Sequence, residues 1–131
     1  MRATVALTAL ILFSSATLGQ EASPEGIWRD SFGTTLQFSL CGEGTQLCAT
    51  LLDVQGESRT EGNLAFVNQQ IMQADQVAAN QWKGTVMFDG SEAESTITQV
   101  APDTVEIEGC RAVVLCQTLS FNRVSDAAPA S

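Results

Sequence analysis

The sequence predicts an all-β protein, a small antiparallel up-and-down barrel of about eight strands with two local disulfides. Three observations indicate this class. Short runs in which apolar and polar residues alternate recur at intervals of about eight to twelve residues. Tight turns rich in glycine and aspartate join almost all of these runs, and two pairs of cysteines each bracket one turn. A two-sheet sandwich is the alternative, but a closed barrel leaves no strand edge exposed.

The N-terminus is typical of a secretory signal peptide. One positive charge on Arg2 precedes an apolar run, Ala3 to Leu18, that ends in small residues. We expect cleavage after Gly19, with Ala16 as the alternative position. Because the run is too short for a comfortable membrane span, we expect a periplasmic or secreted protein without a transmembrane segment.

The rest of the chain has the length of one domain. We assign residues 20–124 to a single β-barrel domain. Residues 125–131 are assigned to a disordered tail, because they have nothing to bury.

The composition is acidic, with 15 Asp and Glu residues, 6 Lys and Arg residues and no histidine. Nucleic acids and anionic membranes attract positive charge, so neither is an expected partner. Without histidine, Ser-His and Cys-His nucleophile pairs and histidine metal sites are excluded. We expect a monomer that carries no cofactor and no metal.

The first strand, Gly26 to Asp30, leads through a turn at Ser31 to Gly33 into a hairpin from Thr34 to Val54. Gly42 and Gly44 mark the turn of this hairpin, because glycine reaches positive φ without strain. In its first strand, apolar side chains alternate with polar ones and so share one face: Leu36, Phe38 and Leu40.

Four cysteines in an exported chain favour two disulfides. Cys41 and Cys48 lie at the two inner ends of the hairpin turn, and Cys110 and Cys116 bracket a later turn. Of the three possible pairings, this local one is favoured, and each short loop should add about 2 to 2.5 kcal/mol of stability. We expect Cys41→Ser and Cys110→Ser each to lower the melting temperature. A zinc site is the competing interpretation, but no Cys-x-x-Cys spacing is present.

The middle of the chain is ambiguous. The polar stretch Gln55 to Gly62 predicts an exposed loop. Residues 63–78 carry apolar side chains at spacings that suit either a helix or a strand. We predict a short helical turn near Asn63 to Asn68, followed by a strand.

Alternation returns from Gln81 onward, and Asp89-Gly90-Ser91 has the composition of a hairpin turn. A β-branched run from Ala93 to Val100 and alternating runs at 104–108 and 119–123 complete the strands. On the strand that begins near Gln81, four residues share one face: Trp82, Gly84, Val86 and Phe88.

Two distant segments resemble a known arrangement. Gly26-Ile27-Trp28 on the first strand, with Arg123 on the last, resembles the lipocalins, in which an arginine covers an N-terminal Gly-x-Trp at the closed end of the barrel. A guanidinium over an indole is worth roughly 0.5 to 2 kcal/mol. The resemblance implies a structural cation–π contact between Trp28 and Arg123 that ties the first strand to the last.

A wider set of motifs resembles the exported bacterial family called domain of unknown function 2147. This resemblance covers essentially the whole chain after the signal peptide and implies a small lipocalin-like β-barrel of unassigned function. The motifs are, in order, Gly26-x-Trp28, Leu40-Cys41-Gly42 with Leu47-Cys48, Trp82-x-Gly84, Phe88-Asp89 before Gly90, Val105 to Cys110, and Phe121-x-Arg123-Val124.

The barrel, the resemblance and the lack of catalytic groups favour a periplasmic module that binds a small apolar or amphipathic molecule. Eight strands enclose an interior that can hold one small ligand. Because ligand pockets are mostly apolar and aromatic, Trp82, Phe88 and Phe38 are the candidate ligand-binding residues. The alternative is an envelope protein-interaction or structural module without a ligand.

We predict that the protein is not an enzyme. The remaining catalytic hypothesis is a hydrolase that uses paired carboxylates. Oxygen ligands also alternate from Asp89 to Glu94, loosely as in a calcium loop, but the segment lacks the full ligand count and is better explained as an acidic turn. The carboxylate candidates are Asp30, Asp53, Asp89, Glu92 and Glu94.

Overall fold

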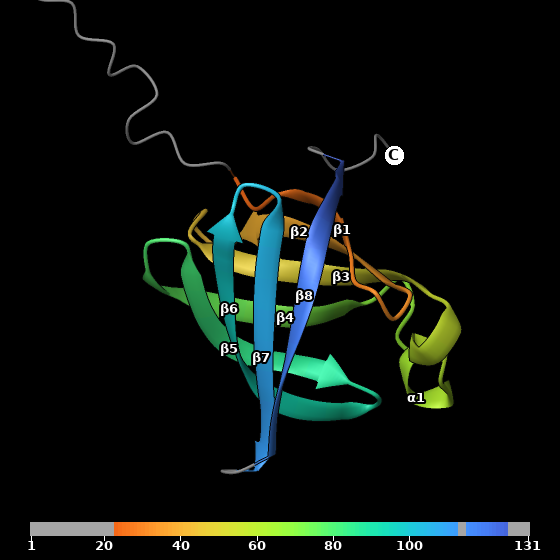
Figure 1. Ribbon diagram of the computed structural model, residues 1–131. Coiled ribbons are helices and arrows are strands. Elements are labelled where there is room, and N and C mark those ends of the chain that lie inside the picture. The colour runs from red at the N-terminus through yellow and green to blue at the C-terminus, as the bar shows by residue number, and fades with distance from the viewer. Residues whose placement is uncertain (1–22, 113–114, 126–131) are drawn as a thin grey trace, which may run out of the picture.

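The protein is a closed barrel of eight antiparallel strands, which the computed structural model describes over residues 23–112 and 115–125. Each strand pairs with its neighbours in sequence, and β1 pairs with β8 to close the barrel (Figure 1). The predicted all-β up-and-down barrel is confirmed. The strands are β1 Gly26–Arg29, β2 Thr34–Cys41, β3 Gln46–Val54, β4 Gln70–Ala78, β5 Gln81–Phe88, β6 Ser91–Ala101, β7 Thr104–Ala112 and β8 Leu115–Ser125.

The hydrophobic core fills the barrel because alternate residues of each strand point inward. Along β6, for example, Ala93, Ser95 and Ile97 are buried, whereas Glu92 and Glu94, on either side of Ala93, are exposed. The largest fully buried side chains include one tryptophan and two phenylalanines: Trp28, Phe38 and Phe121.

Both predicted disulfides are confirmed. Cys41 bonds Cys48 and so joins β2 to β3, while Cys110 bonds Cys116 and joins β7 to β8. In the register of β7 and β8, Cys110 lies directly opposite Cys116. By contrast, Cys48 lies opposite Ser39, so the first disulfide runs diagonally across its strand pair.

The connection between β3 and β4 differs from the sequence prediction. The predicted loop 55–62 holds a 3-10 turn, η1 (Gly56–Ser58), and the first residues of α1 (Glu61–Leu64), which begins two residues before the predicted helical turn. The helix begins here because the Thr60 hydroxyl accepts a hydrogen bond from the Asn63 amide at 3.1 Å. The expected strand then follows as β4.

The predicted signal peptide and its cleavage site lie outside the described residues, and so do residues 126–131 of the predicted tail. Residue Ser125, the first of that tail, is the last residue of β8. Within the described part of the chain, no helix has the length and hydrophobicity that crossing a bilayer requires.

Candidate functional site

The barrel has two ends, which we call upper and lower, and which lie toward the upper left and toward the bottom and right of Figure 1. The short turns β2–β3, β4–β5 and β6–β7 lie at the upper end. The connections β1–β2, β3–β4, β5–β6 and β7–β8 lie at the lower end, together with α1. The two disulfides are divided between the ends, with Cys41–Cys48 at the upper end and Cys110–Cys116 at the lower.

The upper half of the interior is filled by aromatic side chains. The rings of Trp28 and Phe38 have centroids 5.7 Å apart, and both side chains are fully buried. The indole N–H of Trp28 donates to the Pro24 carbonyl at 2.9 Å. That of Trp82 donates to the Thr45 carbonyl at 3.0 Å, which ties β5 to the β2–β3 turn. Each buried indole nitrogen therefore has a hydrogen-bond partner, as buried polar groups require.

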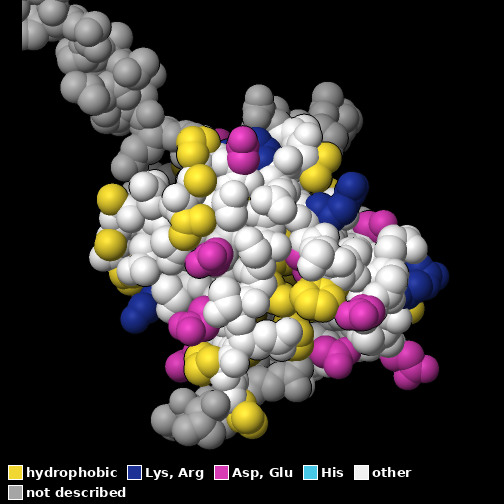
Figure 2. Space-filling model, in the orientation of Figure 1, with side chains coloured by type: hydrophobic (Ala, Val, Ile, Leu, Met, Phe, Trp, Pro, Cys, Tyr) yellow, Lys and Arg dark blue, Asp and Glu magenta, His cyan; other side chains and the backbone are white. Residues whose placement is uncertain are grey.

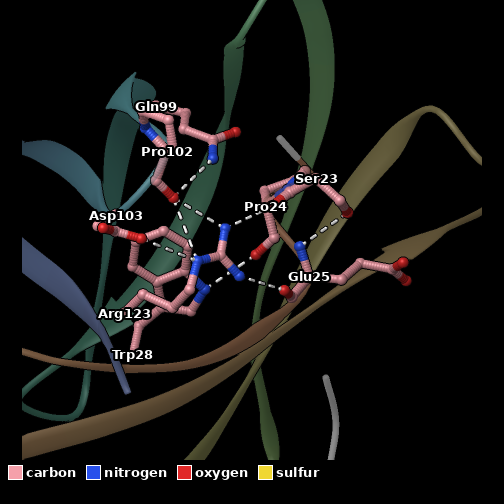
Figure 3. A network of polar contacts seen from close by, with 8 residues as sticks. All are labelled: Ser23, Pro24, Glu25, Trp28, Gln99, Pro102, Asp103 and Arg123. Carbon is pink, nitrogen blue, oxygen red and sulfur yellow. Dashed lines mark hydrogen bonds and ion pairs between the residues drawn. The ribbon is translucent and has the colours of Figure 1, made fainter. Parts of the chain in front are cut away.

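Arg123 closes the upper end over Trp28, as Figure 3 shows. Its guanidinium carbon lies 4.5 Å from the centroid of the Trp28 ring. The same group donates to the carbonyls of Glu25 at 2.8 Å and Ser23 at 2.6 Å, and to that of Pro102 at 2.9 Å. A planar guanidinium has enough donors to serve three carbonyls at once. It therefore joins the first strand, the last strand and the β6–β7 turn.

The lower half is less completely filled on the side formed by β5 to β8. A cavity of about 310 Å³ opens between the lower ends of β5 to β8. Its inner wall is apolar and consists of Val86, Phe88, Ala93, Ile107, Gly109 and Leu119. Leu115, Cys116 and Gln117 of β8 form its outer rim, and Gln117 is the one polar side chain among the nine described residues that line it.

A second, smaller cavity of about 50 Å³ lies next to the first. Four residues line both cavities and therefore lie between them: Val86, Phe88, Ile107 and Leu119. Asn63 and Phe66 belong to the connection between β3 and β4, and they line only the smaller cavity. The lower half thus combines packed core side chains, such as Leu36 and Leu51, with a divided apolar space beside them.

The β3–β4 connection, residues 55–69, covers part of the lower end and is called the covering segment below. The Thr60 hydroxyl donates to Asp89 Oδ1 at 2.6 Å, and the Asn63 side-chain oxygen accepts from the Asp89 amide at 2.9 Å. A Cβ at Gly62 would lie 2.6 Å from the Asp89 carbonyl, so only glycine permits this close approach. The covering segment is therefore fastened to the β5–β6 turn.

The structure does not bring the three candidate ligand-binding residues together. Phe88 lines both cavities. Phe38 is buried against Trp28 in the filled half, and Trp82 is buried beneath the β2–β3 turn. Of the three, only Phe88 remains a candidate for contact with a ligand in the lower cavity.

The candidate carboxylates do not form a catalytic pair in this cavity, because none of the described residues that line it is acidic. Asp30 is buried in the β1–β2 turn, where its Oδ1 accepts from the amides of Phe32 and Thr34. Asp89 holds the covering segment. Glu94 lies on the outer surface, in a shallow groove that it shares with Lys83 and Glu108.

Sequence reasoning missed most of the residues that line the cavity, above all Gly109, Gln117 and Leu119. The available signal was the alternation itself. On β7 it places Val105, Ile107 and Gly109 on the inner face, and the lack of a side chain at Gly109 leaves space at the lower end.

The comparisons with known proteins agree with this architecture. Over 80% of its length, the chain superposes with a TM-score of 0.59 on a protein from the human pathogen Helicobacter pylori that is described as belonging to the lipocalin family. The match covers 85% of that protein, at 13% sequence identity. The fold is lipocalin-like. At this identity the likeness concerns the fold alone. No family model and no curated protein match the chain.

Proposed function

We propose that the protein is an extracytoplasmic binding module that holds a small apolar or amphipathic molecule in the lower half of its barrel. The observation that carries this proposal is the apolar wall of the cavity of about 310 Å³ at the lower end, whereas a groove of about 280 Å³ at the upper end has Thr45, Gln76 and Asn80 in its wall. Cavities of this size and character are typical of small-molecule sites. A lipocalin-like fold supports the same function.

The face of the barrel drawn in Figure 2 offers less to a protein partner. Figure 2 shows one face of the barrel, on which apolar side chains lie in small separate groups among polar and acidic ones. A protein-interaction site is more often a contiguous apolar patch. The envelope-interaction alternative is therefore kept as an outcome of the binding test.

The proposed location is the periplasm or the extracellular space. Two disulfides are consistent with an oxidising compartment. The apolar N-terminal run and the resemblance to domain of unknown function 2147 support export to such a compartment.

Gly109 offers a direct test of the cavity. A Cβ at this position would meet only the Ala93 methyl, at 3.9 Å, so a larger side chain enters the cavity without a backbone clash. We expect Gly109→Leu to fill the space and to weaken binding of the neutral fluorophore N-phenylnaphthylamine by about tenfold or more. The matched control, Gly109→Ala, should bind the probe as the parent does.

Fluorescence titration and native mass spectrometry of the mature chain measure the affinity and the stoichiometry. A saturable one-to-one complex that Gly109→Leu abolishes supports the proposal. Equal affinity in Gly109→Leu and the parent would place the probe elsewhere and overturn the assignment of the site. If neither the fluorophore nor a co-purified molecule binds, the interaction-module alternative becomes the better explanation.

A further inference from the structure

The two disulfides lie in different environments. Cys41–Cys48 is at the filled end of the barrel, where Cys48 is only 7% exposed. Cys110–Cys116 is at the hollow end, where Cys110 is half-buried and Cys116 is exposed. Attack on a disulfide requires access of a thiolate to one sulfur, and exposed disulfides are the exchangeable ones. The two bonds should therefore differ in their reactivity.

The Cys110–Cys116 bond also borders the cavity, since Cys116 lines it while Cys110 lines the outer groove with Glu94 and Glu108. Cys116 lines the cavity, and so do its two neighbours in sequence, Leu115 and Gln117. On the other strand, Gly109 lines the cavity and immediately precedes Cys110. Since Cys110 lies directly opposite Cys116, the bond fixes the spacing of the two strands at the point where they form the rim.

We propose that Cys116 is a site of thiol–disulfide exchange at which an external dithiol opens the Cys110–Cys116 bond and loosens the wall of the cavity. In the other disulfide Cys41 is half-buried and Cys48 is buried, so neither cysteine is as exposed as Cys116. The effect on the ligand rests on the proposed function, whereas the exchange itself does not.

The chemistry is complete with one dithiol. A thiolate of the dithiol attacks the sulfur of Cys116, the S–S bond breaks, and Cys110 leaves as a thiolate that takes up a proton. The second thiolate of the dithiol then attacks the sulfur that the dithiol contributes to the mixed disulfide. Cys116 leaves as a thiolate and takes up a proton. Two electrons pass to the protein, which ends with two thiols, and the dithiol ends as a disulfide.

The exchange is tested by partial reduction. The mature oxidised protein is equilibrated in dithiothreitol buffers of graded redox composition, alkylated with iodoacetamide and analysed by peptide mass spectrometry. We expect alkylation of Cys110 and Cys116 to begin at a lower ratio of reduced to oxidised dithiothreitol than alkylation of Cys41 and Cys48. The two ratios should differ by about tenfold. Simultaneous opening of both bonds, or earlier opening of Cys41–Cys48, would overturn the proposal.

The attacked sulfur is identified with glutathione, which can be trapped as a mixed disulfide. The adduct should lie on Cys116, with Cys110 free for alkylation, because Cys116 is the more exposed of the two. An adduct found mainly on Cys110 contradicts the assigned site.

The loosening of the wall is measured without a ligand, by hydrogen exchange. Selective reduction should increase amide exchange about tenfold or more near the rim on β7 and β8, while β2 and β3 stay protected. The double variant Cys110→Ser with Cys116→Ser should reproduce this result without reductant and should bind N-phenylnaphthylamine about fivefold or more weakly than the oxidised parent.

The matched control is Cys41→Ser with Cys48→Ser, which should keep the oxidised rim and the parent's affinity for the probe. If amide exchange at the rim is the same in the oxidised and reduced states, the proposed loosening of the cavity wall is refuted. Increased exchange together with no probe binding in any form refutes the binding function but leaves the exchange site standing.

Discussion

The two halves of this barrel are built from the same eight strands but are filled differently. In the upper half, inward positions carry large rings, such as Trp28, Phe38 and Trp82. In the lower half, inward positions on β6 and β7 are occupied by Ala93 and Gly109. The backbone is continuous through both halves, so side-chain size at inward positions decides which end is a core and which end is a cavity.

The difference extends to the ends themselves. Arg123 closes the upper end with hydrogen bonds to three backbone carbonyls in two segments of the chain. The lower end is only partly closed, by a covering segment held through Thr60 and Asn63. We therefore expect changes in the upper half to affect stability, and changes in the lower half to affect binding more than stability.

The largest effect should come from Trp28→Ala. The side chain is fully buried between Phe38 and Arg123, and its truncation leaves a cavity that its close-packed neighbours cannot fill. We expect a loss of about 3 to 5 kcal/mol in the free energy of unfolding, measured by urea denaturation. The control Trp28→Phe keeps a ring but loses the bond to the Pro24 carbonyl, and should cost less. A loss below about 1 kcal/mol for Trp28→Ala would mean that the upper half is not the rigid one.

A second test compares two isoleucines that lie opposite each other. Ile97 and Ile107 are cross-strand partners on β6 and β7, but Ile97 is fully buried and only Ile107 lines the cavity. Alanine at Ile97 opens a new cavity and should cost about 4 kcal/mol, whereas alanine at Ile107 enlarges an existing one and should cost about 2 kcal/mol.

The same pair of variants separates stability from binding. The affinity for N-phenylnaphthylamine should change in Ile107→Ala and stay near the parental value in Ile97→Ala. Thermal unfolding and probe titration provide the two measurements. Equal losses of stability together with equal affinities would show that the cavity wall does not differ from the adjacent core in packing.

The sequence predicted the strands, the hairpins and both disulfides, because each depends on local alternation, turn residues and short spacing. It also predicted that Phe38, Trp82 and Phe88 face inward. It did not predict their depth along the barrel axis. Depth depends on the stagger between strands, including the register shifts in β2–β3 and β4–β5, and no local pattern reveals these.

The covering segment shows a similar limit. The spacing of apolar residues places its helix two residues too late, because the helix begins at the N-cap Thr60 and not at an apolar residue. The bonds from Thr60 and Asn63 to Asp89 join positions 29 and 26 residues apart. Such contacts become visible only in the folded chain, and they decide how far the lower end is closed.

The smallest effect should come from Thr60→Ala, which removes the helix cap and the bond to Asp89 together. We expect a loss of about 1 kcal/mol in the free energy of unfolding. Thr60→Ser keeps a hydroxyl at the same place and should restore most of it. The more informative measurement is amide hydrogen exchange, which should increase in the covering segment and not around Trp28. An increase at both ends would mean that the halves unfold as one unit, so that the hollow end could not open while the filled end stays closed.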